Sequence, residues 1–219
     1  MKDLETLAYE LDRYGAADAC QQLISRFFDL HTQGRNKEVV ELFADRDDNQ
    51  LEMPWGVYVG KKGIERCFLE DYGDVSDPEV AEKMKGRLDV HTFGTSILEF
   101  DDENKIGRAI GNGSGFETFV EEDGAKAFWS WAKFGMDFIK EEGEWKIWSF
   151  KIYPLFRSPY EVAFVDYEKA PYEGVMTEAQ IDHPLDQPLF SYDPKRPLPD
   201  DEPVIIKPFS KYEDLGYIW

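Results

Sequence analysis

The chain has 219 residues, of which 42% are hydrophobic and 15% aromatic, and this supports one domain with an extension. Its 25 basic and 45 acidic residues give a formal net charge of −20, which opposes binding to phosphate backbones and to anionic membranes. Composition therefore excludes nucleic acid as a main partner.

The N-terminus is charged from its first residues, and no run of about 18 apolar residues is present that could span a bilayer. We therefore expect a cytoplasmic protein without a signal peptide or a membrane segment. Cys20 and Cys67 are isolated, as is usual in a reducing compartment. Neither a disulfide nor a thiol metal site is indicated.

The N-terminal third is predicted to be mainly helical. Apolar residues recur at helical spacing in 3–13 and again in 16–33, where Gly34 supplies a stop, so two helices are expected. The elements predicted next are a short helix at 36–43, a strand at 50–59, a helix at 61–72 and, at 74–86, a loop with a turn or two of helix.

The middle of the chain predicts an antiparallel meander of four strands. The strands are expected at 88–100, 105–120, 126–141 and 145–153. Acidic turn sequences at 101–104 and 121–124 separate the first three. The last two strands form a hairpin around Glu142-Gly143-Glu144 that carries four of the six tryptophans. Arms longer than the usual ~5–6 residues indicate a curved sheet with room for a cavity.

Helices followed by a meander predict an α+β fold in which N-terminal helices pack on a strongly curved antiparallel sheet and leave a pocket on its concave face. From Pro154 onward the composition changes, since ten of the twelve prolines lie at or beyond this position, together with many aromatic residues. We expect a domain at 1–157 and an extended tail at 158–219 that wraps this domain or a neighbouring subunit. A disordered tail is the alternative.

Three stretches of sequence resemble the SnoaL-like branch of the nuclear transport factor 2-like superfamily. They are the helical segment from Leu23 to Ala44, the WGVYVGKKGI stretch from Trp55 to Ile64, and the closing hairpin from Lys133 to Tyr153 with its W-K-I-W arm. The resemblance covers roughly residues 5–160. It implies a cone with a largely apolar pocket open at one end.

The superfamily includes cofactor-free ketosteroid isomerases, polyketide cyclases, dehydratases and a diarylpropane lyase that releases formaldehyde, as well as proteins that only bind. The fold alone therefore does not fix the function. This sequence departs from several of these enzymes. Thr32 stands where an Asp is often found, and Ser149 and Lys151 stand where many relatives carry His. No Asp–His dyad is carried over from the family.

Tyr58 and His91 are the proposed catalytic residues. Tyr58 precedes a Gly-Lys-Lys-Gly turn, and in resembling proteins the corresponding strand leads to the pocket mouth, where a phenol can stabilise an oxyanion. His91 can exchange protons near neutral pH, and resembling dehydratases use a histidine in a comparable region. Trp55 is expected in the pocket wall or core, and His31 and His183 are weaker candidates. The alternatives are a half-buried strand tyrosine and a structural histidine.

The long strands supply the candidate substrate-binding residues. On the strand at 105–120, Arg108 and Asn112 belong to a polar row, whereas the opposite face is nearly bare because of three glycines, which indicate a bend, a bulge or room for a ligand. Trp131 and Lys133 share a face of the hairpin. Ser149 and Lys151 share a face of the final strand. A lysine among tryptophans would bind a carboxylate or phenolate, or else extend its ammonium group from an aromatic subunit interface.

No phosphate loop, dinucleotide fingerprint, nucleophile elbow or metal-ligand spacing occurs in the sequence, so no cofactor or metal is implied. We expect a cofactor-independent lyase, dehydratase or isomerase that transfers protons on a hydrophobic aromatic or polycyclic small molecule. The diarylpropane lyase suggests retro-aldol loss of formaldehyde as a specific version. The alternative is a non-catalytic ligand-binding or assembly protein. A homodimer or homotrimer is expected in either case.

Overall fold

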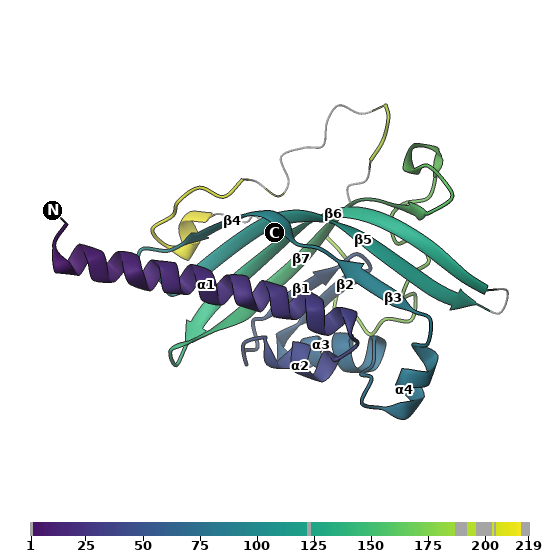
Figure 1. The fold of residues 1–219 in the computed structure, drawn as a ribbon, viewed down its shortest axis with the longest axis horizontal. Helices are drawn as coiled ribbons and strands as arrows, with labels where there is room; N and C mark the ends of the chain where they lie inside the picture. Colours follow the sequence, from purple (N-terminus) through teal and green to yellow (C-terminus); the bar gives the residue numbers. More distant parts are fainter. Residues whose placement is uncertain (1, 122–123, 187–191, 196–202, 204, 216–219) are drawn as a thin grey trace.

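The computed structural model describes residues 2–121, 124–186, 192–195, 203 and 205–215 (Figure 1). The helices and strands of the domain, in chain order, are α1 (Leu4–Thr32), α2 (Asn36–Glu41), β1 (Gln50–Met53), β2 (Gly56–Val59), α3 (Gly60–Glu65), a π-helix (Arg66–Asp71), α4 (Pro78–Lys83), β3 (Leu88–His91), β4 (Gly94–Phe100), β5 (Ile106–Glu121), β6 (Gly124–Glu141) and β7 (Glu144–Pro159).

The seven strands form one curved sheet in the order β2-β1-β7-β6-β5-β3, and β4 also pairs with β5 (Figure 1). The helices lie against one face of this sheet, which we call the inner face. The opposite face is called the outer face. The core lies between α1 and the inner face, where the Phe27 ring is 4.9 Å from Phe150 and the Phe28 ring is 5.4 Å from Phe134. The predicted α+β class is confirmed.

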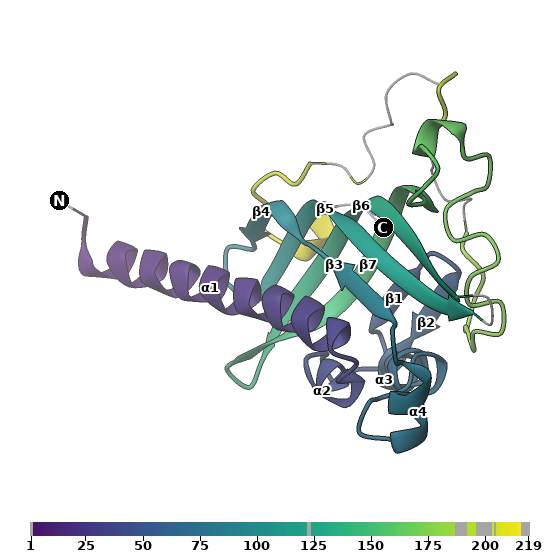
Figure 2. The same cartoon turned by 45° about the vertical axis from the view of Figure 1, so that its right-hand side comes forward.

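The N-terminal helix is continuous, so the prediction of two helices is wrong. Asp3 caps it by accepting a hydrogen bond from the backbone N–H of Thr6 at 2.8 Å. Gly15 lies within the helix and has open space around it. One glycine costs a helix only about 1 kcal/mol relative to alanine, which is too little to break it. The first turns of α1 project beyond the rest of the domain (Figure 2).

Two segments predicted as single strands are each divided in two. The segment at 50–59 is a hairpin that turns at Pro54-Trp55, and β1 pairs in parallel with β7, so the sheet is mixed and not purely antiparallel. The segment at 88–100 divides into β3 and β4, which both pair with β5. The pairing register shifts near Gly94, next to Thr95 with a positive φ of 46°.

The predicted tryptophan-rich hairpin is confirmed as β6 and β7. Glu142 and Gly143, with φ of 51° and 90°, form its two-residue turn, since Glu141 pairs with Glu144. Left-handed conformations at both turn positions match the right-handed twist of the arms. An irregularity opposite Asp137 shifts the register of β7, so the strand does not keep one alternation of faces over its whole length.

The described part of the tail packs on its own domain. The backbone N–H of Val57 donates to the carbonyl of His183 at 2.9 Å, and Asp182 accepts from the N–H of Val59 at 2.8 Å. Farther along, Tyr212 lies on the outer face, while Ile206 and Phe209 are buried. The rest of the predicted tail, and residues 122–123 of the predicted turn at 121–124, lie outside the described residues.

Among the described helices, none combines the length and the apolar character that a membrane crossing requires.

Candidate active site

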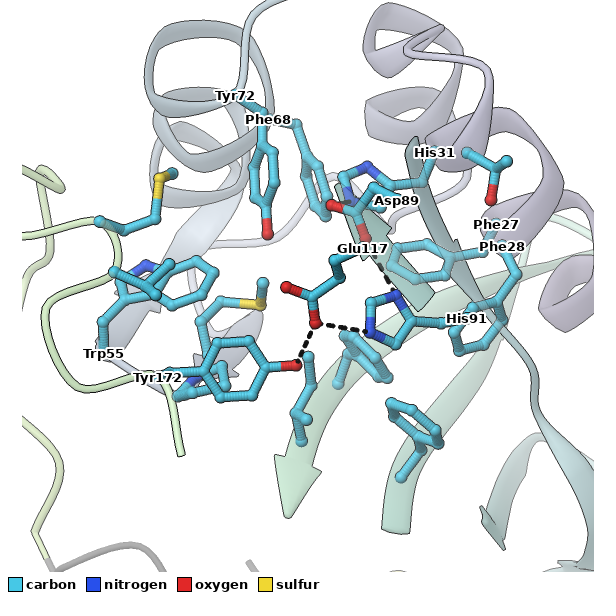
Figure 3. A pocket seen from close by; sticks show the side chains of 18 of the residues that line it. Phe27, Phe28, His31, Trp55, Phe68, Tyr72, Asp89, His91, Glu117 and Tyr172 are labelled. Carbon is cyan, nitrogen blue, oxygen red and sulfur yellow. Dashed lines mark hydrogen bonds and ion pairs between the residues drawn. The ribbon is translucent and has the colours of Figure 1, made fainter. Parts of the chain in front are cut away.

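A cavity of about 60 Å³ lies on the inner face, between the end of α1, the π-helix, β3, the long strands and the tail (Figure 3). Its apolar wall is formed by Phe27, Phe28, Met53, Phe68, Phe134, Phe150 and Ile152. Its polar lining is formed by His31, Thr32, Tyr72, Arg87, Asp89, His91, Glu117 and Tyr172. The cavity thus joins flat aromatic surfaces to a cluster of ionisable groups.

Strand β3 and the residue before it place three of these groups side by side. Arg87, Asp89 and His91 alternate along the chain, and because successive side chains of a strand point to opposite faces, all three face the cavity. Asp89 pairs with Glu117 of β5, and His91 pairs with Gly115. The register thereby brings a second carboxylate beside the histidine.

The glycines of β5 make room for the chain that crosses them. A Cβ added at Gly115 would lie 2.4 Å from Nε2 of His91, and one at Gly111 would lie 2.5 Å from the ring of Phe93. The bare face noted in the sequence therefore accommodates side chains of β3 and of the link to β4. Gly115 in particular seats the His91 imidazole.

His91 is held between two carboxylates (Figure 3). Its Nδ1 is 3.0 Å from Oδ1 of Asp89, while its Nε2 is 3.7 Å from Oε1 of Glu117, which is longer than a normal hydrogen bond. Burial is the largest influence and lowers the pKa of His91, but interactions with the two carboxylates outweigh it and raise the pKa to about 9. His91 is therefore an imidazolium at neutral pH.

Asp89 is the carboxylate shared by both histidines of the cavity. Burial raises its pKa, but the hydrogen bond with His91 and the neighbouring positive charges hold the pKa at about 2. Its second oxygen, Oδ2, lies 4.0 Å from Nε2 of His31. Asp89 is thus ionised between the two imidazoles.

His31, in the last turn of α1, has a defined tautomer. The amide Nδ2 of Asn36 donates to the carbonyl of Gly73 at 2.6 Å, so the amide oxygen is the atom that faces Nδ1 of His31 at 2.9 Å. Nδ1 must then carry the proton, which leaves the lone pair of Nε2 directed toward Asp89. Burial, the largest influence, lowers the pKa of His31 below 6.5. His31 is a neutral base next to a cationic histidine.

Glu117 is fixed from three directions. Nε of Arg157 donates to its Oε2 at 2.8 Å, the Tyr172 hydroxyl donates to Oε1 at 3.2 Å, and His91 approaches the same oxygen. Tyr172 belongs to the tail, so a segment beyond the last strand completes the polar side of the cavity (Figure 3). Burial raises the pKa of Tyr172 well above 10, and its phenol stays neutral.

The two proposed catalytic residues do not meet in the cavity. His91 lines it, as does Trp55, whereas Tyr58 is fully buried outside the lining. The Tyr58 hydroxyl donates to Asp71 at 2.7 Å and accepts from the Trp55 indole at 3.0 Å. It therefore supports the position of Trp55, and a catalytic role for it stays a prediction.

Six of the predicted binding residues lie on the outer face, away from the cavity: Arg108, Asn112, Trp131, Lys133, Ser149 and Lys151. Arg108 forms a two-pronged pair with Asp137 at 2.5 and 2.6 Å, and Lys151 pairs with Glu52 at 2.7 Å. The hydrophobic effect explains this placement, since Ala132, Phe134, Met136 and Phe138 on the alternate face of β6 belong to the core that packs against α1. Substrate binding by these six residues stays a prediction without support from the cavity.

Sequence reasoning missed Asp89, Glu117, Arg87 and Tyr172, and it ranked His31 low. The alternation Arg87-Leu88-Asp89-Val90-His91 is a readable signal, because it places three ionisable side chains on one face of a strand. Nothing local marks Tyr172. In the part of the chain that the structure describes, no group of three His, Cys, Asp or Glu side chains is arranged to hold a metal ion.

Three solved structures share this architecture. A putative scytalone dehydratase from Novosphingobium aromaticivorans is 10% identical with a TM-score of 0.54, and the match covers 70% of this chain and 93% of that one. An NTF2-like protein with a cystatin-like fold from the same organism is 16% identical with a TM-score of 0.52, over 69% of this chain and 90% of that one. The hexachlorocyclohexane dehydrochlorinase LinA-type3 from Novosphingobium barchaimii is 18% identical with a TM-score of 0.53, over 72% of this chain and 99% of that one. At these identities the likeness shows a common fold.

A comparison with curated protein sequences gives no match. A family model for the SnoaL-like domain, in contrast, matches residues 13–151, which is more than half of the chain. The matched range contains most of α1, the whole of β3 to β6 and half of β7, and thus both histidines of the cavity. The protein therefore belongs to the SnoaL-like domain family.

Proposed function

We propose that this protein is a cofactor-independent lyase that removes a small molecule, such as water, from an aromatic substrate by paired proton transfer. The observation that carries the proposal is the position of His31 and His91 on either side of Asp89, with pKa values displaced in opposite directions. Two titratable groups whose environments separate their pKa values are the signature of an acid and base pair.

His31 acts as the base. Its Nε2 lone pair faces the cavity because Asn36 fixes the proton on Nδ1. Removal of a proton from a substrate carbon gives an imidazolium 4.0 Å from the Asp89 carboxylate, which stabilises the new charge. The electron pair of the broken C–H bond forms the carbon–carbon double bond of the product.

His91 acts as the acid. Its Nε2 proton points toward Glu117 across 3.7 Å, so this proton is not held in a short hydrogen bond and a leaving oxygen can accept it. As the carbon–oxygen bond breaks, the oxygen takes the bonding electrons and the His91 proton and departs as water. Exchange with solvent returns a proton to His91 and removes one from His31.

The same pair suits retro-aldol loss of formaldehyde. His31 would take the proton of a primary hydroxyl, the carbon–carbon bond would break to release formaldehyde, and His91 would protonate the carbon left behind. The phenylalanine walls favour a flat aromatic substrate in either reaction. The names of two similar structures support an elimination, since one is a putative scytalone dehydratase and the other a dehydrochlorinase.

The test is incubation with a panel of β-hydroxylated and phenolic aromatic compounds, followed by mass spectrometry for loss of water or of formaldehyde. His31→Gln and His91→Gln should each lower the rate by about 10²–10⁴-fold. The matched control is His183→Gln, because the His183 side chain is exposed and only its backbone is bonded to Val57. Its rate should equal that of the wild type.

Wild-type rates in both His31→Gln and His91→Gln would contradict the acid and base assignment. Binding of panel compounds without any mass change would instead support a non-catalytic binding protein.

A further inference from the structure

Arg87 is the cation of the cavity that has no assigned role in the proposed reaction. It follows Gly86, whose φ of 76° forms the turn from α4 into β3. The Thr118 hydroxyl donates to the carbonyl of Gly86 at 2.8 Å and accepts from the N–H of Leu88 at 2.7 Å. The backbone on both sides of Arg87 is thereby fixed to β5, and its side chain is directed into the cavity lining.

The Arg87 guanidinium is sandwiched between rings and retains free donors. It lies 5.9 Å from the centre of the Tyr72 ring and 5.6 Å from that of Phe119. Within the described part of the chain, its one charged neighbour inside 4 Å is Asp89, at 3.9 Å from Nη2, beyond hydrogen-bond distance. The side chain lines the cavity and is 26% exposed, so it can be reached from solvent.

The other arginine of the site is built differently. Arg157 is 7% exposed and donates to Glu117 at 2.8 Å, while its guanidinium lies 4.0 Å from the Phe128 ring centre. Its charge is consumed by a short ion pair. Arg87 has the same chemistry and aromatic packing but no such partner, which is the arrangement expected of a ligand-binding arginine.

The charged groups in and directly behind the cavity lining leave one positive charge over. In the lining, Arg87 and His91 are cationic, Asp89 and Glu117 are carboxylates, and His31 is neutral. Arg157, which lies outside the lining and pairs with Glu117, supplies the third cation. This local excess occurs in a chain whose formal net charge is −20, so a general attraction for anions does not explain it. A ligand with a single negative charge would balance it.

We propose that Arg87 binds the carboxylate of the substrate, which makes the substrate an aromatic carboxylic acid. The guanidinium accepts the carboxylate as a two-pronged pair at the cavity opening, and the ring lies on the phenylalanine wall. The carbons between them are then held beside His31 and His91. That the bound acid is a substrate rests on the proposed function, whereas the anion site itself does not depend on catalysis.

The experiment measures binding of trans-cinnamate and of its uncharged amide, trans-cinnamamide, to the full chain by titration calorimetry. The two probes have the same ring and nearly the same shape, and differ in charge. The wild type should bind cinnamate about tenfold or more tightly than cinnamamide, because only the carboxylate can form a charge-assisted pair with Arg87. Arg87→Gln should bind both probes equally, and Arg87→Lys should keep part of the preference.

The control variant is Arg35→Gln, because Arg35 is exposed and pairs with Glu38 on the surface. It should behave as the wild type. A preference for cinnamate that survives in Arg87→Gln, or a wild type that binds the two probes equally or binds neither, would overturn the proposal. Circular dichroism of each variant shows whether the fold is retained, and Arg87→Lys serves if Arg87→Gln does not fold.

The same titration on His31→Gln separates the two proposals. An inactive His31→Gln that still prefers cinnamate supports both of them. An Arg87-dependent preference in a protein that transforms no panel compound would leave the anion site standing and overturn the lyase.

Discussion

The two faces of the sheet both carry buried ion pairs, but the pairs differ in how completely they are closed. On the outer face, Arg108 meets Asp137 at 2.5 and 2.6 Å, and the Tyr212 hydroxyl donates to the same carboxylate at 2.9 Å. On the inner face, Arg157 meets Glu117 at 2.8 Å and His91 meets Asp89 at 3.0 Å, but separations of 3.7, 3.9 and 4.0 Å recur between the other ionisable groups of the cavity.

The difference separates a structural cluster from a reactive one. The short pair of the outer face satisfies its charges internally, and its hydrogen bond with Tyr212 holds this face to the tail. Pairs that stop short of hydrogen-bond distance leave donors and lone pairs available to a ligand. Burial of charge alone therefore does not identify the site, whereas the spacing of the charged atoms does.

The largest effect on folding is expected on the outer face. Asp137→Ala removes the carboxylate that neutralises the buried Arg108 guanidinium, and should lower the free energy of unfolding by about 3–5 kcal/mol. The double variant Arg108→Met/Asp137→Leu should recover much of this loss, since neither charge remains. Urea unfolding followed by tryptophan fluorescence measures both. A loss below about 1 kcal/mol for Asp137→Ala would mean that the outer pair is not closed in solution.

A smaller effect on stability, but a specific one on activity, is expected at Gly115. An alanine Cβ would lie 2.4 Å from both Nε2 of His91 and Oγ of Ser130, so the imidazole must shift. Overpacking of this kind costs about 1–3 kcal/mol. The rate on a panel substrate should fall further than the stability loss explains. The control is Gly143→Asn in the β6–β7 turn, where an added Cβ meets nothing within 4 Å and asparagine tolerates the positive φ. Equal rates in the two variants would contradict the seating of His91 by Gly115.

A pH dependence of stability also distinguishes the inner face. The pKa of His91 is raised from 6.5 to about 9 by folding, so its stabilisation is fully present below pH 6.5 and is lost as the pH rises through about 9. The melting temperature of the wild type should therefore fall across this range by more than that of His91→Gln.

Activity should also fall as His91 loses its proton near pH 9, and again on the acid side as His31 gains one below pH 6.5. If the melting temperatures of wild type and His91→Gln change in parallel from pH 6.5 to 9, the double-carboxylate environment of His91 is contradicted.

The strand pattern predicted much of the fold because it depends on local periodicity. Long alternating runs and a Gly-containing acidic turn determine the β6–β7 hairpin wherever it packs, and the helical spacing around Leu23 and Phe27 determines most of α1. Breaks were harder to predict. Pro54 is a turn signal that the prediction of one strand at 50–59 overlooked, whereas the break at Thr92-Phe93 is marked only by Gly94 and follows from pairing with β5.

Only part of the candidate site could be predicted from the sequence. The chemistry of histidine singles out His91, and the structure places it at the cavity. The mixed face of the long strands singles out Arg108 and Lys133, and the structure places that face on the outer side. Alternation divides a strand into two faces, but only packing against α1 decides which face encloses the cavity.

By itself, the sequence determined the α+β class, the family, the aromatic hairpin and one histidine of the candidate pair, since each depends on local pattern and residue type. Only the tertiary structure decided that His31 from α1, Asp89 and His91 from β3, Glu117 from β5 and Tyr172 from the tail converge. These groups come from segments far apart in the chain. Their protonation states depend on distances and burial that no local pattern contains.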